Sequence, residues 1–85
     1  MRRNMKLTAS DQASFRVGFR KAVARWNAGD TWEVIRAHYD GDNACDAGAV
    51  AAVEELSGCR ATAENTCRVY GVPYAELCEE VARGK

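Results

Sequence analysis

The stretch Tyr70-Gly71-Val72-Pro73-Tyr74 separates two helical patterns near the end of this 85-residue sequence. Gly71 suits the end of a helix because glycine adopts the left-handed conformation without a steric penalty. Pro73 suits the start of the next helix because its φ is fixed and it has no N–H to satisfy. Apolar residues follow helical spacing on both sides, at Ala63, Cys67 and Tyr70 and then at Tyr74, Leu77, Cys78 and Val81. The stretch therefore predicts a helix, a tight turn and a second helix.

Residues 59–84 resemble the second half of a helix-turn-helix domain of the pipsqueak or resolvase type. The phrase Tyr70-Gly71-Val72-Pro73, followed by Leu77 and Val81, carries this resemblance over somewhat less than a third of the chain. It implies a helix-turn-helix-like C-terminal half and, in such families, DNA binding through the second helix. Here that helix offers carboxylates outward, which would repel the phosphates that supply most non-specific affinity. Its outward positions are Ala75, Glu76, Glu79, Glu80 and Arg83.

Capping residues and glycines mark the expected starts and ends of helices in the remainder of the chain. A capping residue with an acid three positions later occurs at Thr8 with Asp11, Asp30 with Glu33, and Asn43 with Asp46. Predicted helix ends fall at Gly29, Gly41, Gly58, Gly71 and Gly84. The expected helices are 9–28, 31–39, 44–57, 61–70 and 73–83, and no stretch alternates like a strand. The sequence predicts one all-α domain over residues 1–85, a compact unit of about five short helices, with a flexible basic arm at 1–7.

Composition limits the class of protein. Apolar residues make up 47% of the chain, which favours a folded domain, yet no run is long enough to span a membrane. No apolar segment follows Met1-Arg2-Arg3, so a signal peptide is not expected. Cys45, Cys59, Cys67 and Cys78 show no metal-binding spacing, and we interpret them as small buried side chains. With one histidine and no catalytic motif, the sequence predicts a cytoplasmic, non-enzymatic protein without cofactor, metal or membrane contact.

The predicted core takes one face of each helix. Its members are Phe15, Phe19, Trp26, Ile35, Val53, Leu56, Leu77 and Val81, and Trp32 and Tyr39 are also expected to be buried. Gly18 lies in the middle of the first helix, where glycine costs about 1 kcal/mol relative to alanine. We therefore expect another backbone to come close at Gly18, and the alanine-rich helix around Gly48 to allow tight packing.

The opposite side of the first helix carries a second, smaller apolar stripe of Ala13, Val17 and Ala24. Arg16 and Arg20 border it on one edge, and Lys21 and Arg25 on the other. Residues 1–25 hold seven basic side chains and one acidic, a net +6, and residues 26–85 hold five basic and eleven acidic, a net −6. The basic residues of the first segment can pair with the acidic residues of the second within the monomer. They can also face a partner of opposite charge, or simply be solvated. The candidate partner-binding residues are Arg16, Val17, Arg20 and Lys21, with Glu76, Glu79 and Glu80 as an acidic counterpart.

Two functions fit these patterns. The first is a small regulatory or inhibitor protein that binds another protein or a second copy of itself. By analogy, compact chains of this kind are typical of phage and mobile-element products that block a host system. The alternative is a helix-turn-helix DNA-binding regulator with its turn at Gly58, reading DNA through Arg60, Asn65 and Arg68. A continuous positive face joining the first and fourth helices would favour DNA.

Overall fold

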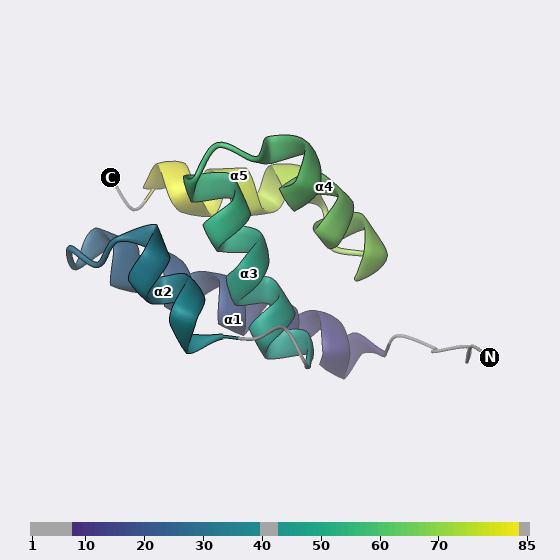
Figure 1. Cartoon of the computed structure of the whole chain (residues 1–85). Coiled ribbons are helices and arrows are strands. Elements are labelled where there is room, and N and C mark those ends of the chain that lie inside the picture. Colours follow the sequence, from purple (N-terminus) through teal and green to yellow (C-terminus); the bar gives the residue numbers. More distant parts are fainter. Residues whose placement is uncertain (1–7, 40–42, 84–85) are drawn as a thin grey trace.

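The computed structural model describes residues 8–39 and 43–83, and helices account for most of them (Figure 1). The helices are α1 (Ala9–Asn27), α2 (Trp32–His38), α3 (Ala44–Leu56), α4 (Arg60–Val69) and α5 (Tyr74–Arg83). These residues contain no strand, so the prediction of a small all-α domain of five helices is confirmed. The predicted arm at 1–7 and the predicted helix ends at Gly41 and Gly84 lie outside the described residues.

Local capping explains where most of these helices begin. The Thr8 hydroxyl accepts a hydrogen bond from the Asp11 N–H at 3.1 Å, and the Asp11 carboxylate accepts one from the Thr8 N–H at 3.0 Å. Asn43 caps α3 in a similar way by accepting from the Asp46 N–H at 2.8 Å. The prediction that Asp30 caps the second helix is wrong. Thr31 caps α2 instead, because the Asp30 carboxylate turns toward Arg25, 3.1 Å from its Nε.

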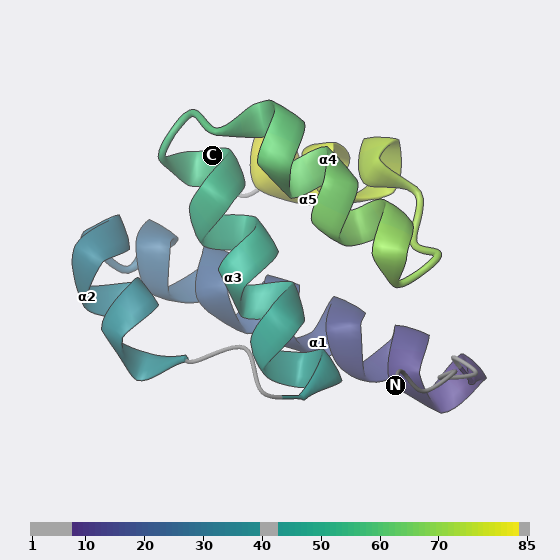
Figure 2. The same cartoon turned by 45° about the vertical axis from the view of Figure 1, so that its right-hand side comes forward.

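Helix α3 lies at the centre of the fold. Figures 1 and 2 show it between α1 on one side and the α4–α5 pair on the other, with α2 alongside. It is apolar around most of its circumference, as expected for a helix with neighbours on several sides. Its buried residues are Ala47, Gly48, Ala49, Ala51, Ala52 and Val53.

Two glycines allow α1 and α3 to cross at close range. A Cβ added at Gly18 would stand well under 3.0 Å from the carbonyl oxygen of Cys45 on α3, a distance that real Cβ atoms do not show. Reciprocally, a Cβ at Gly48 would collide with the carbonyl oxygen of Phe15 on α1. The backbone approach expected at Gly18 and the tight packing expected around Gly48 both occur at this one crossing of α1 and α3. Each helix contributes one of the two glycines.

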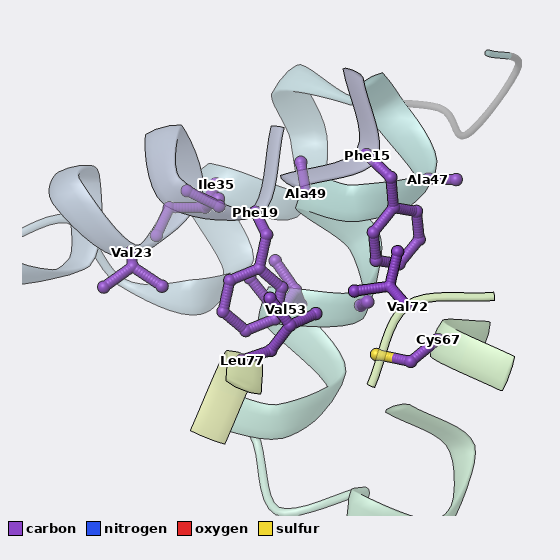
Figure 3. Close-up of a cluster of buried hydrophobic side chains, with 13 residues drawn as sticks. Phe15, Phe19, Val23, Ile35, Ala47, Ala49, Val53, Cys67, Val72 and Leu77 are labelled. Atoms are coloured by element: carbon purple, nitrogen blue, oxygen red, sulfur yellow. The ribbon is translucent and has the colours of Figure 1, made fainter. Parts of the chain in front are cut away.

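The core fills the space around this crossing (Figure 3). Of the predicted members, Phe15, Phe19, Ile35, Val53 and Leu77 are buried, and Trp26, Tyr39 and Val81 pack half-buried against them. Two expectations are wrong. Trp32 is 39% exposed because α2 buries only Ile35, and Leu56, in the last turn of α3, is only half-buried and lies outside the core cluster. The turn residue Val72 joins the core, where the sequence pattern did not place it.

The cysteines differ more than the sequence suggests. Cys67 is buried, Cys45 and Cys78 are half-buried, and Cys59 is exposed at the N-terminal end of α4, so the expectation of four buried thiols is wrong for Cys59. Within the described ranges no group of histidine, cysteine or acidic residues is arranged to hold a metal ion. None of the described helices has the length and apolar character needed to cross a membrane.

Candidate functional site

The basic edge of α1 and the acidic edge of α5 meet in one surface. Nε of Arg16 lies 2.6 Å from the Glu76 carboxylate, and a second Arg16 nitrogen donates to the other carboxylate oxygen at 3.2 Å. One turn further on both helices, Nε of Arg20 lies 3.4 Å from the Glu80 carboxylate. Both pairs join residues 60 positions apart, so α1 and α5 run parallel along this edge, which Figure 1 also shows.

Two of the acidic candidate residues on α5 are taken up by ion pairs within the protein. Glu76 and Glu80 are half-buried and hold the arginines of α1, so they do not form a separate acidic face. Only Glu79 is exposed, and it makes no ion pair among the described residues. The intramolecular pairing left open by the charge distribution is therefore present between α1 and α5.

Val17 lies beside these ion pairs on the outward side of α1. Its side chain is 42% exposed, and its surface neighbours at helical spacing are Ala13, Lys21 and Ala24, all exposed. Lys21 makes no ion pair with any described residue. The surface thus combines one exposed valine, one uncompensated lysine and two arginines that form ion pairs with carboxylates of α5. We call Ala13, Val17, Lys21 and Ala24 the outer face of α1.

The Arg16–Glu76 pair is expected to contribute modestly to stability. Its side chains are 30% and 37% exposed, and pairs open to water are typically worth about 0.2–1 kcal/mol. A double-mutant cycle of Arg16→Ala and Glu76→Ala, followed by urea unfolding, should give a coupling free energy in that range that decreases at high salt. As a control, Arg36→Ala on α2 should add independently to Glu76→Ala. A coupling near zero for Arg16 and Glu76 would show that the contact does not persist in solution.

The candidate DNA-reading residues all lie exposed on α4, each within reach of neighbouring polar groups. Nε of Arg60 is 3.7 Å from the Glu55 carboxylate. Arg68 is 3.7 Å from the Glu64 carboxylate and donates to Asn65 at 3.4 Å. Helix α4 packs against α3 and α5, and α1 meets the turn that follows α4, where the Phe15 ring stacks on Tyr70 with ring centroids 4.9 Å apart. The structure brings Asn65 and Arg68 together, and no hydrogen bond or ion pair among the described residues joins them to the arginines of α1.

A polar cluster that the sequence analysis missed connects α3, α4 and α5. The Tyr74 hydroxyl donates to the Glu55 carboxylate, and the Thr66 hydroxyl is 3.0 Å from the Glu54 carboxylate. Burial and the hydrogen bond to Glu55 raise the pKa of Tyr74 above its ordinary value. A signal for this cluster exists in the sequence, because two acids in the last turn of a helix oppose its dipole unless they have partners.

The buried thiol of Cys67 has no nucleophilic character at neutral pH. Burial, together with smaller contributions from the neighbouring Cys78 and acidic groups, raises the pKa of Cys67 to about 11. Since the thiolate is the reactive form, Cys67 acts here as an apolar core residue. Its sulfur lies within the core in Figure 3.

Comparisons of this chain with protein families, with curated proteins and with solved structures give no match. The fold and the surfaces described above therefore carry the functional argument, and the helix-turn-helix resemblance stays a prediction.

Proposed function

We propose that this protein is a small cytoplasmic regulator or inhibitor that acts by binding another protein through the outer face of α1. The observation that carries the proposal is Val17, an exposed apolar side chain next to two arginines held by Glu76 and Glu80. Side chains already fixed in the free protein lose less conformational freedom on binding. The uncompensated Lys21 adds a preference for a partner that offers a carboxylate beside an apolar pocket.

Protein binding is favoured over DNA binding by the distribution of charge. The formal net charge of the chain is zero, whereas DNA-binding domains usually present a basic patch or stripe. The arginines of α1 face Glu76, Glu80 and Asp30, and those of α4 face Glu55 and Glu64. Phosphates would have to compete with these carboxylates at each contact. DNA binding through Arg60, Asn65 and Arg68 remains the alternative to be tested.

Val17→Asp is expected to weaken binding strongly while leaving the fold intact. A charge placed in an apolar contact is costly, and we expect affinity for the partner, or self-association of the purified chain, to fall at least about tenfold. Exposed substitutions usually change the free energy of unfolding by no more than about 0.5 kcal/mol. The measurements are sedimentation over a concentration series, affinity capture from the source lysate, and urea unfolding of the same variant.

Val69→Asp supplies a matched control, because Val69 on α4 is 60% exposed and lies on a different helix. It should bind like the wild-type protein. Equal binding by the Val17→Asp, Val69→Asp and wild-type proteins would exclude the outer face of α1. A mobility shift of duplex DNA at physiological salt that disappears in Arg60→Ala or Arg68→Ala, and persists in Val17→Asp, would replace this proposal with the alternative.

A further inference from the structure

A second feature lies at the turn between α1 and α2, at the end of the molecule opposite α4 (Figure 1). An open hollow of about 430 Å³ is lined there by Trp26, Gly29, Asp30, Thr31, Trp32 and Glu33. It contains both tryptophans of the chain. Large aromatic side chains that stay accessible to solvent are among the residues that most often anchor binding partners.

The turn that forms the hollow is held by several local contacts. Gly29 has a φ of 111°, which a residue with a side chain rarely adopts, and this lets the chain reverse directly after α1. The Asp30 carboxylate lies 3.1 Å from Nε of Arg25, and the contact is an ion pair in which this Nε makes no hydrogen bond. Thr31 then caps α2 by accepting from the Val34 N–H at 3.3 Å. The two indoles are therefore carried by short, fixed segments.

The charges around the hollow favour a cation. The carboxylates of Asp30 and Glu33 line it, and although Arg25 offsets Asp30, Glu33 is exposed and has no ion pair within the described part of the chain. The carbonyl end of the 19-residue helix α1 also lies at this turn, and it carries partial negative charge. The N-terminal end of α2 also lies at this turn and carries partial positive charge. This charge is small because α2 has only seven residues, and Glu33 in its first turn offsets it.

We propose that this hollow binds a cationic side chain, an arginine or a lysine, from a basic segment of a partner protein. Indole faces attract cations more strongly than other aromatic rings do, and arginine can in addition stack its planar guanidinium on them. Glu33 supplies the compensating carboxylate. The hollow is separate from the outer face of α1, so it does not depend on the function proposed above.

The test uses the full-length protein and a short peptide with blocked ends whose only charged residue is a central arginine. Because both tryptophans line the hollow, the two indole N–H signals in NMR spectra and the intrinsic fluorescence report directly on binding. We expect both indole signals to shift saturably with the arginine peptide. The same peptide with norleucine in place of arginine, which keeps the aliphatic length and removes the charge, should bind at least tenfold more weakly.

Variants separate a specific site from general attraction. Trp32→Ala should weaken binding at least tenfold, and Glu33→Gln should weaken it several-fold while leaving the circular dichroism spectrum unchanged. Glu79→Gln, which removes an exposed carboxylate of α5, is the matched control and should bind like the wild-type protein. The proposal is overturned if the arginine peptide shifts neither indole signal, if the norleucine peptide binds equally well, or if Glu79→Gln weakens binding as much as Glu33→Gln. Val17→Asp should leave this binding unchanged.

Discussion

Replacing Gly48 by alanine is expected to lower the free energy of unfolding by about 3 kcal/mol or more, the upper end of the range for overpacked cores. The new methyl group would occupy the space of the Phe15 carbonyl oxygen on α1. A backbone carbonyl cannot move aside as a side chain does, so α1 and α3 must separate. Their separation would loosen the most extensive helix contact of the fold. Thermal unfolding should show a midpoint lower by roughly 10–20 °C for a domain of this size.

The sign of this effect distinguishes the crossing from ordinary helix propensity. In an unconstrained helix interior, glycine to alanine stabilises by about 1 kcal/mol. Ala13→Gly, at an exposed position of α1, should accordingly destabilise by about that amount and serves as the control. If Gly48→Ala were stabilising, α1 and α3 would not cross as closely as described.

Gly18 and Gly48 belong to one crossing, so their effects should not add. Gly18→Ala alone should also be strongly destabilising, because its methyl group would meet the Cys45 carbonyl. Once one substitution has moved the helices apart, the second finds part of the space already open. The double variant should therefore lose less stability than the sum of the two single variants.

Local signals explain why the helices were predictable from sequence. Helix ends depend on contacts between residues three to five positions apart, as at Thr8, Asn43 and Gly71. They can therefore be predicted from the sequence without knowledge of the fold. Capping preferences alone do not decide between two adjacent residues that can both cap, as Asp30 and Thr31 can. The contact of Asp30 with Arg25 on α1 settles it.

The candidate surfaces depended on packing that local rules do not contain. Sequence patterns identified Arg16, Arg20, Glu76 and Glu80 as outward charges, but their pairing joins positions 60 residues apart and follows from the parallel course of α1 and α5. The exposure of Trp32 has a similar origin. A helix as short as α2 offers too few turns for apolar periodicity to show which of its faces is buried.

Phe19→Ala is expected to lower the free energy of unfolding by about 3–5 kcal/mol, the usual range for removing a core aromatic side chain. Phe19 is 1% exposed, and Figure 3 shows its ring extending toward Val53 of α3 and Leu77 of α5. It therefore connects three helices, and the cavity left by alanine would be bordered by all of them. Because folded domains are stable by only about 5–15 kcal/mol, this single change should bring the chain close to unfolding at 37 °C.

The measurement is urea unfolding at 25 °C, followed by circular dichroism, with Val17→Ala as the matched control. Val17 is two residues away on the same helix but points outward, so its loss should change the free energy of unfolding by less than about 0.5 kcal/mol. Phe19→Leu should recover part of the stability lost in Phe19→Ala, because leucine refills much of the cavity. A cost below about 1 kcal/mol for Phe19→Ala would mean that α1 presents a different face to the core. Val17 and Phe19 are separated on α1 by a rotation of about 200°. If Phe19 did not face the core, Val17 would not face solvent, and the outer face of α1 could not be the binding surface.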